Sequence, residues 1–342
     1  MKTTEPLLCA IEHLQEGKTL SADEIAGAFR VIMNGGATDG LIGCFLGILA
    51  TRTPTGQELF GASTVMRECA ERIDLPNRRD LLDTCGTGGA PKTFNVSTAA
   101  SIVSAACGVR VAKHGNRSRT GRGSAEILEK LGINIDASIN QQINCLRDAG
   151  ICFCFAPKHH KAVANVMPVR KELPFPTIFN LLGPLTNPCS AGRQLLGVWD
   201  DQYVTPVAES LLAHGTVKSA VVHSNDGLDE LSISAPTRVI YVIEGRLIEE
   251  TIDPRQVGLK MWNIDEVTAD SLDSATDMIY DCLVEKKPGA PRDMVLLSSA
   301  VGLFLADLVN SVSDGVIMAS KSIDSGATKR LIEKWGKISN TE

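Results

Sequence analysis

Residues 81–124 read LLDTCGTGGAPKTFNVSTAASIVSAACGVRVAKHGNRSRTGRGS and contain the same local pattern twice. In each copy an apolar run leads into a glycine-rich loop, and a polar residue then opens a helical pattern. The first loop covers 86–94 and its helix opens at Asn95, whereas the second covers 113–123 and its helix opens at Ser124. The pattern predicts two strand–loop–helix units in succession, which is typical of an α/β fold.

Both loops have the composition of an anion-binding site. The start of a helix leaves backbone N–H groups without partners and carries the positive end of the helix dipole, so it holds phosphate well. Glycine lets the backbone come close to a ligand. Hydroxyl groups and positive charge are added by Ser97, Thr98, Lys92 and Lys113. One such loop could equally be an ordinary strand-to-helix turn, but two basic loops in succession favour a phosphate-rich ligand.

Composition and charge indicate an ordinary cytoplasmic globular protein. The 342 residues are 44% apolar and 22% charged with a net charge of −6, which argues against a general nucleic-acid-binding protein. We expect neither secretion nor a membrane span, because no basic-apolar leader opens the chain and the longest apolar run, 41–50, is too short. The ten cysteines contain no C-x-x-C pair and no Cys/His group at zinc spacing, so we expect buried free thiols.

The periodicity predicts a small N-terminal all-helical domain, residues 1–74, and a larger α/β domain, residues 75–342. The helical part includes a capping box at Ser21 and Glu24. In the larger part apolar strands alternate with helices, which predicts a mostly parallel central sheet covered by helices and an edge hairpin near residue 245. The run 41–50 is apolar on nearly every side, so it is either a core helix of the helical domain or a surface that packs against a second copy of the chain. We favour a homodimer through the helical domain, and the prolines of 168–190 suggest that this segment crosses back to that domain.

Further motifs resemble one family, the anthranilate phosphoribosyltransferases, which are nucleoside phosphorylase-like phosphoribosyltransferases. The matching segments follow the family order from residue 81 to 230. They are GTGG (86–89), TFNVST (93–98), KHGNRS (113–118), GSA (123–125), FAP (155–157), HH (159–160), PVR (168–170), TIFNLLGPLTNP (177–188) and DGLDE (226–230).

The resemblance implies a Mg²⁺-dependent pentosyltransferase of tryptophan biosynthesis. Such an enzyme transfers the 5-phosphoribosyl group from phosphoribosyl pyrophosphate to the amine of anthranilate and releases pyrophosphate. By matching position, the resemblance implies donor binding by Gly86, Gly89, Thr93, Asn95, Val96, Ser97, Thr98, Lys113 and Ser124. It implies acceptor binding by Gly86, Asn116 and Arg170, with His114, His160 and Gly183 near the acceptor route. The magnesium-contacting positions would be Ser97, Asp229 and Glu230.

The expected chemistry asks for the same residue types. Pyrophosphate leaves poorly unless its charge is neutralised, and adjacent carboxylates such as Asp229 and Glu230 suit Mg²⁺. An arginine such as Arg170 can hold a carboxylate by two parallel hydrogen bonds. Ribosyl transfer passes through an oxocarbenium-like state, so positioning and charge stabilisation suffice without a nucleophilic side chain.

Three segments depart from the family pattern. Ala90-Pro91-Lys92 replaces an aspartate in the first loop, which is one residue shorter, and 119–122 replaces a serine-rich part of the second loop. Pro174-Phe175-Pro176 stands where the family has glycine. The added Arg119 and Arg122 are expected to make the donor site more positive. A different aromatic acceptor, a phosphorylase-like activity, or a non-catalytic phosphoribosyl-binding role therefore stay open as alternatives.

Overall fold

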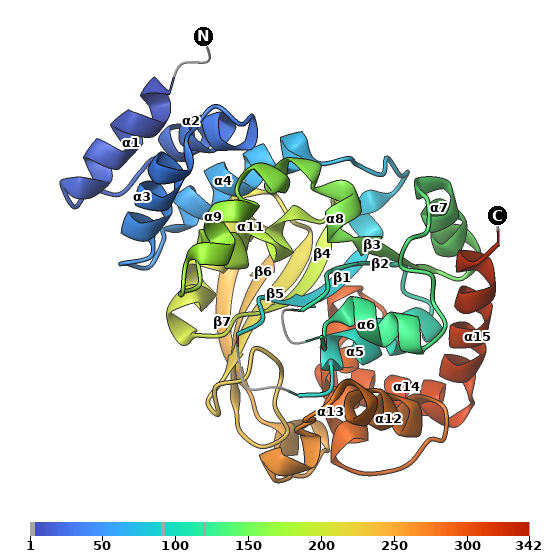
Figure 1. Cartoon of the computed structure of the whole chain (residues 1–342). Helices are drawn as coiled ribbons and strands as arrows, with labels where there is room; N and C mark the ends of the chain where they lie inside the picture. Colours follow the sequence, from blue (N-terminus) through green and yellow to red (C-terminus); the bar gives the residue numbers. More distant parts are fainter. Residues whose placement is uncertain (1–3, 90–92, 119–120, 342) are drawn as a thin grey trace.

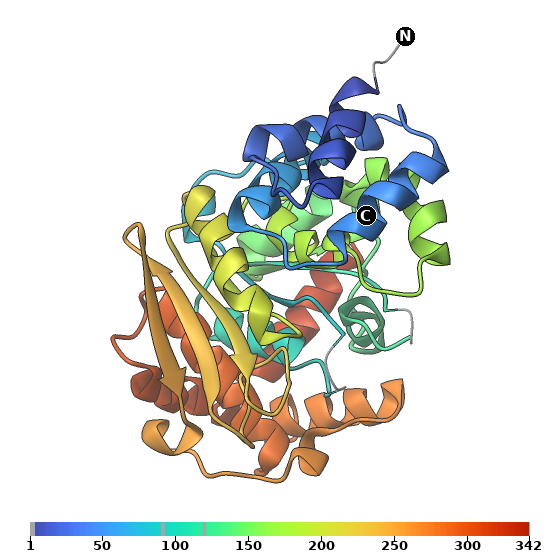
Figure 2. The ribbon, with the colours of Figure 1, turned by 90° about the vertical axis from the view of Figure 1, so that its left-hand side faces the viewer.

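The computed structural model describes residues 4–89, 93–118 and 121–341 of the chain. It confirms the expected fold class, because a group of N-terminal helices lies at one end of a larger α/β body (Figures 1 and 2). The N-terminal helices are α1 (Glu5–Gln15), α2 (Ala22–Met33), α3 (Asp39–Leu49) and α4 (Gly56–Cys69). The Ser21–Glu24 capping box is present at the start of α2, where the Glu24 carboxylate accepts from the Ser21 N–H at 2.8 Å.

A seven-stranded sheet in the order β3-β2-β1-β4-β5-β6-β7 forms the centre of the molecule. The strands are β1 (Leu82–Gly86), β2 (Val111–Gly115), β3 (Ile151–Phe155), β4 (Arg193–Gly197), β5 (Lys218–Ser224), β6 (Thr237–Ile243) and β7 (Arg246–Ile252). The first five run parallel and the last two are antiparallel. The expected hairpin joins β6 to β7, with Glu244 and Gly245 at φ 50° and 74° as a tight I′-type turn requires.

Helices cover both faces of the sheet because alternate strand residues are apolar on both sides. In β5, Ala220 and Val222 pack into the core with the C-terminal helices, whereas Val221 packs on the opposite face. The helices after the N-terminal group are α5 (Val96–Ala106), α6 (Ser124–Lys130), α7 (Ile139–Asp148), α8 (Ala156–His159), α9 (Met167–Glu172), α10 (Ile178–Leu182), α11 (Val204–Ala213), α12 (Leu272–Leu283), α13 (Ala290–Leu305), α14 (Val312–Asp324) and α15 (Ala327–Ser339). Short 3₁₀ turns are η1 (Arg78–Asp80), η2 (Lys161–Asn165), η3 (Pro184–Thr186), η4 (Asp201–Tyr203), η5 (Pro254–Val257) and η6 (Ile264–Val267).

The segment carrying α9 and α10 packs against the N-terminal helices. The rings of Phe29 in α2 and Phe179 in α10 lie 5.3 Å apart, and both belong to one apolar core that also takes in one face of the sheet. The return of this segment toward the helical end is therefore seen directly, whereas a domain boundary at residues 74 and 75 stays a prediction. No helix within the described ranges is both long and apolar enough to cross a bilayer.

His214, at the C-terminal end of α11, makes stability depend on pH. Its Nε2 lies 2.7 Å from the Ser63 hydroxyl of α4, its ring packs on Phe60, and burial lowers its pKa to about 3. Between this value and ~6.5 the unfolded chain binds a proton that the folded chain does not, so stability falls as pH falls. We expect the wild type to lose about 2 kcal/mol more than His214→Gln between pH 7 and pH 5 in urea unfolding. Equal losses in the two proteins would contradict a neutral His214.

Candidate active site

Five parallel strands have their carboxyl ends at one edge of the sheet, and the first glycine loop and the segment 226–230 follow two of those ends. The chain moves from β1 outward to β2 and β3 and then returns to β4 on the other side of β1. The connections after β1 and β4 therefore diverge, which is the arrangement where open α/β sheets bind ligands. Gly86 ends β1 and Gly197 ends β4, and these two glycines are paired across the strands. The segment 226–230 follows β5 at the same edge.

Asp229 and Glu230 contact the first glycine loop and the start of α5. The Asp229 carboxylate accepts from the Gly88 N–H at 2.9 Å, and the Glu230 carboxylate accepts from the Ser97 N–H at 3.3 Å. Both acidic residues are half-buried. The structure thus brings together Gly86, Gly88, Ser97 and the acidic pair, which the sequence separates by more than 130 residues.

Glycine is required around Asp229 because the backbones approach closely. A Cβ on Gly86 would lie 2.8 Å from the Asp229 carboxylate, and a Cβ on Gly197 would lie 1.6 Å from the Asp229 carbonyl oxygen. No side chain fits at such a separation without moving the acidic segment. The two strand-terminal glycines therefore fix where the Asp229 carboxylate sits.

The electrostatics of the pair suit a divalent cation. Burial raises the pKa of Asp229, and the hydrogen bond from Gly88 offsets part of that rise. Burial, and then the charge of Asp229, raise the pKa of Glu230, while Lys113 acts in the opposite direction. Burial and mutual repulsion make it costly to ionise both carboxylates. A cation bound between them stabilises the ionised form of both. With the nearby Ser97 hydroxyl they form an all-oxygen donor set that fits Mg²⁺.

Lys113 is placed differently from the sequence interpretation, which put it in the second loop. Strand β2 continues through Lys113 and His114 to Gly115, and the lysine side chain is only 1% exposed. Its ammonium group donates to the Thr84 carbonyl at 2.7 Å and to the Ser97 hydroxyl at 3.4 Å. Lys113 therefore supplies positive charge from beneath the start of α5, and burial lowers its pKa.

The two loops contact each other through Asn95 and Arg122. Asn95 has a φ of 62°, and its side-chain amide donates to the Arg122 carbonyl at 3.1 Å. The Arg122 guanidinium donates to the carbonyl of Ala269, so this cation is tied to the segment before α12. A carbonyl does not neutralise the guanidinium charge, so the expectation that Arg122 makes the donor site more positive stays a prediction. Residues 90–92, Arg119 and Thr120 lie outside the described residues.

The second loop packs closely on itself. The Ser124 hydroxyl donates to the Asn116 carbonyl at 3.4 Å, and the exposed Asn116 side chain accepts from the Arg117 N–H at 2.7 Å. A Cβ on Gly115 would lie 2.2 Å from the Ser124 hydroxyl, and one on Gly123 would lie 2.5 Å from the Asn116 carbonyl oxygen. Ser124 and Asn116, predicted to bind donor and acceptor respectively, are therefore neighbours.

His114 and His160 form a buried pair, with ring centroids 5.1 Å apart. The Nε2 atoms of both rings are buried and have no hydrogen-bond partner among the described residues. Burial lowers the pKa of His160 to about 4 and the pKa of His114 well below its ordinary value. The backbone of Gly183 partly offsets the shift of His114, which places these three predicted residues together. Both rings are neutral at pH 7.

The other predicted residues have distinct surroundings. Arg170, in α9, has its guanidinium carbon 5.0 Å from the ring centroid of Phe179 and one nitrogen 3.9 Å from the Met167 sulfur.

Val96 and Thr98 are buried in the first turn of α5, and the Thr98 hydroxyl has no partner among the described residues. Gly89 is exposed at φ 101° and Thr93 is half-buried. Phe175, in the divergent Pro-Phe-Pro segment, is 39% exposed.

Sequence reasoning missed Asp83 and Thr87. The buried Asp83 carboxylate accepts from the His114 N–H at 3.0 Å and from the Gln194 amide at 3.2 Å, so it positions the end of β2. The Thr87 hydroxyl accepts from the Trp199 N–H at 3.1 Å, which joins the first loop to the segment after β4. The sequence does carry one signal for Asp83, because it is a charged residue within an otherwise apolar run.

Fold and site together define a glycosyltransferase with a helical bundle and an α/β domain. Two family models match: the glycosyl transferase family helical bundle domain over residues 9–70, and the glycosyl transferase family a/b domain over residues 78–329. The chain belongs to the anthranilate phosphoribosyltransferase branch of these pentosyltransferases.

Two curated relatives and two solved structures illustrate the similarity. The anthranilate phosphoribosyltransferase of Halorhodospira halophila is 42% identical, covering 96% of this chain and 97% of the relative. That of Rubrobacter xylanophilus is 41% identical, with 96% of both chains covered. The crystal structure of anthranilate phosphoribosyltransferase from Thermus thermophilus matches with a TM-score of 0.91 and 33% identity, covering 97% of this chain and 99% of that one. The Saccharomyces cerevisiae enzyme in complex with PRPP and Mg has the same fold, with a TM-score of 0.88 and 24% identity over 98% of both chains.

Proposed function

We propose that this chain transfers the 5-phosphoribosyl group of phosphoribosyl pyrophosphate to anthranilate and releases pyrophosphate, a step of tryptophan biosynthesis. The observation that carries the proposal is the contact of Asp229 and Glu230 with the N–H groups of Gly88 and Ser97. This contact places an acidic pair beside a glycine-rich loop of the phosphate-binding type. The loop lies where the connections after β1 and β4 diverge, which is where open α/β sheets bind ligands. The relatives that bear this activity in their names match along nearly the whole chain.

In this proposal the donor lies over the first loop and the start of α5. Donor contacts are assigned to Gly86, Gly89, Thr93, Asn95, Val96, Ser97, Thr98, Lys113 and Ser124. Asp229, Glu230 and the Ser97 hydroxyl would hold Mg²⁺, which when bound neutralises charge on the departing pyrophosphate. Buried Lys113 adds a fixed positive charge beneath the same point.

Acceptor contacts are assigned to Gly86, Asn116, Arg170, His114, His160 and Gly183. The amine nitrogen forms a bond to C1 of the ribose while the bond from C1 to the pyrophosphate oxygen breaks, and the amine proton passes to solvent. The His114 and His160 rings are neutral, so in this proposal they add no charge beside the aromatic acid. Such a site works by orientation and charge stabilisation rather than by a covalent intermediate.

A fluorescence assay tests the activity directly. The purified chain is mixed with phosphoribosyl pyrophosphate, Mg²⁺ and anthranilate, and loss of anthranilate fluorescence is followed. Uridine or thymidine with orthophosphate replaces these substrates in a parallel reaction. Turnover only of the nucleosides would establish a phosphorylase-like enzyme, and calorimetric donor binding without any turnover would establish a non-catalytic binder.

Replacing Arg170 should chiefly weaken use of the acceptor. A hydrogen-bonded charge pair is worth ~2 kcal/mol, so we expect Arg170→Met to raise the KM for anthranilate by roughly 30-fold and to leave the donor KM unchanged. Methionine keeps an unbranched apolar chain against the Phe179 ring, and Arg170→Lys keeps the charge without the two-pronged geometry. A rise confined to the donor KM would show that Arg170 does not bind the acceptor.

We also propose a homodimer that forms through the helical domain, in the cytoplasm. In α3, Ile42, Phe45, Leu46 and Leu49 are buried, while the outer side carries the apolar or small residues Leu41, Cys44, Gly47 and Ile48. We expect Ile48→Glu to shift sedimentation from dimer to monomer, whereas Leu308→Glu, a change at a 43% exposed leucine of the α/β body, should not. A monomeric wild type would exclude the dimer.

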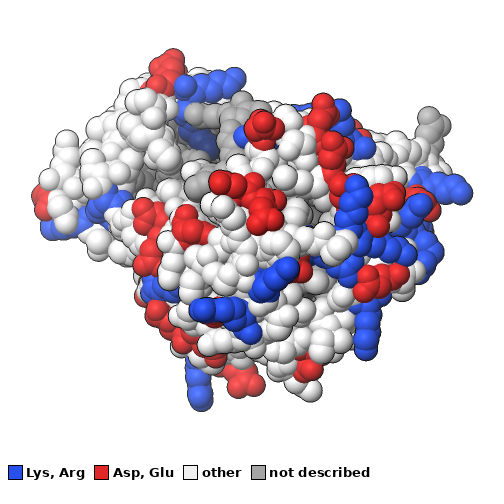
Figure 3. Space-filling model, turned by 90° about the horizontal axis from the view of Figure 1, so that it is seen from below, with Lys and Arg blue, Asp and Glu red and all other residues white. Residues whose placement is uncertain are grey.

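We further propose that neither nucleic acid nor membrane is a partner, in keeping with the net charge of −6. On the face drawn in Figure 3 acidic and basic side chains are interspersed, and the described residues of that face form no extended basic patch.

A further inference from the structure

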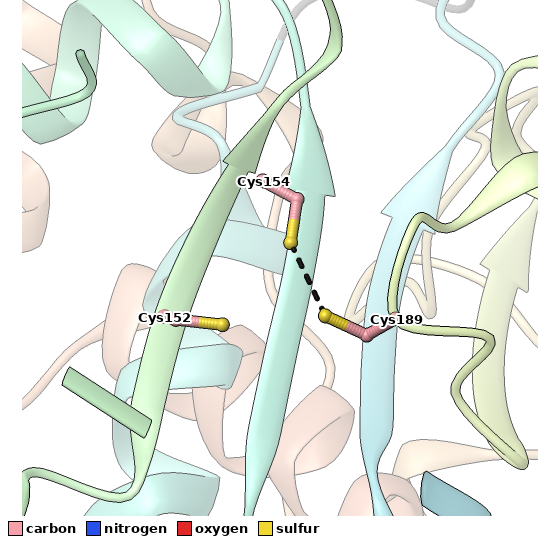
Figure 4. A group of neighbouring side chains, drawn as sticks. All are labelled: Cys152, Cys154 and Cys189. Carbon is pink, nitrogen blue, oxygen red and sulfur yellow. Dashed lines mark hydrogen bonds between the residues drawn. The ribbon is translucent and has the colours of Figure 1, made fainter. Parts of the chain in front are cut away.

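Three buried cysteines come together in the core of the α/β body. Cys152 and Cys154 are two residues apart on β3, so their side chains lie on the same side of the sheet. Cys189 approaches them from the segment between η3 and β4 (Figure 4). Their sulfur atoms all lie within 4.8 Å of one another, and those of Cys154 and Cys189 are 3.6 Å apart. Each residue is at most 1% exposed.

The number and type of donors point to a soft cation. Thiolate sulfur selects Cu(I) and Zn²⁺ over harder ions, and zinc in a closed site takes four ligands. Among the described residues the group offers three sulfurs and no fourth ligand. Nearby His159 already engages the Glu71 carbonyl at 2.7 Å and the Gln142 amide oxygen at 3.2 Å with its two ring nitrogens. We propose that Cys152, Cys154 and Cys189 form a three-sulfur site for monovalent copper.

The three sulfur atoms interact with one another before any metal is bound. Hydrogen bonds from Cys152 and Cys154 hold the pKa of Cys189 below its ordinary value, against the effect of burial. The same contacts and burial raise the pKa of Cys154. Cysteine binds a metal as the thiolate, so each sulfur that coordinates copper releases its thiol proton to solvent, and no electron is transferred. The preference for copper therefore rests on the number of ligands, because a closed zinc site takes four and the described residues offer three.

A competition titration tests the site. The full chain carrying Cys9→Ser and Cys44→Ser, which remove the exposed thiols, is titrated anaerobically with Cu(I) against a chromogenic Cu(I) chelator. We expect one copper per chain and a sulfur-to-copper charge-transfer band. Adding Cys189→Ser should weaken binding at least tenfold, whereas Cys282→Ser, at a buried cysteine elsewhere, should not. Undiminished binding in Cys189→Ser would overturn the proposal, as would failure of the parent to retain copper.

Three further experiments test the site if the serine variant folds poorly. Cys152→Ala keeps an apolar side chain in the core and should also lose the copper. X-ray absorption of the copper-loaded parent should show three sulfur neighbours, and a shell of nitrogen or oxygen neighbours would overturn the proposal. Copper should also raise the urea midpoint of the parent, because a ligand that binds only the folded state stabilises it.

Discussion

The double change Asp229→Asn and Glu230→Gln is expected to lower kcat/KM by about 10³-fold, roughly 4 kcal/mol of transition-state stabilisation. Each amide keeps a carbonyl oxygen to accept from the Gly88 or Ser97 N–H, so the backbone contacts persist while both negative charges are lost. The proposed Mg²⁺ site would thereby lose both of its charged ligands. The rate should be followed by anthranilate fluorescence over a range of Mg²⁺ concentrations.

Two comparisons separate this effect from a general loss of charge or stability. Asp201 is exposed on the surface and forms an ion pair with Arg238. Asp201→Asn removes one negative charge there and should leave the rate unchanged. The melting temperature of the double variant should equal or exceed that of the wild type, because two adjacent half-buried carboxylates repel each other. Undiminished Mg²⁺-dependent turnover in the double variant would exclude a metal-holding role for the pair.

Much of the fold follows from local signals in the sequence. Ser21 and Glu24 are three residues apart and can form a capping box within one helix turn, and Glu244-Gly245 permits the positive φ angles of a tight hairpin. The two glycine loops could also be predicted, because each is defined by residues that are neighbours in the sequence. The two loops and the Asp-Glu corner were identified as one site only through the family resemblance.

The features that were misplaced or missed depend on distant partners. Lys113 looks like a loop residue because a buried ammonium group is costly, and the groups that satisfy it belong to Thr84 and Ser97, 29 and 16 residues away. Arg122 reads as a free basic residue, yet its partner is the Ala269 carbonyl 147 residues later. Cys189 lies 35 residues from Cys154, and no spacing rule reveals that strand β3 and this segment are adjacent.

Gly197→Ala is expected to lower kcat/KM by about 10²-fold or more and to cost ~3 kcal/mol of stability. The new methyl group would lie 1.6 Å from the Asp229 carbonyl oxygen and 2.5 Å from its carbonyl carbon, so β4 or the acidic segment must move. Overpacking of this kind costs ~1–3 kcal/mol, and a displacement of about 1 Å at a positioned group costs about 10²-fold in rate. Urea unfolding and the fluorescence assay at saturating anthranilate measure the two effects.

The neighbouring change Leu196→Ala distinguishes displacement of Asp229 from simple destabilisation. Leu196 is fully buried in the same strand, and its truncation leaves a cavity that costs ~2–5 kcal/mol without placing any atom against the acidic segment. At a temperature where both variants are folded, Leu196→Ala should keep its activity and its Mg²⁺ dependence, whereas Gly197→Ala should need more Mg²⁺ for half-maximal rate. Equal activities in two variants of equal stability would show that the position of Asp229 does not depend on the glycine at the end of β4.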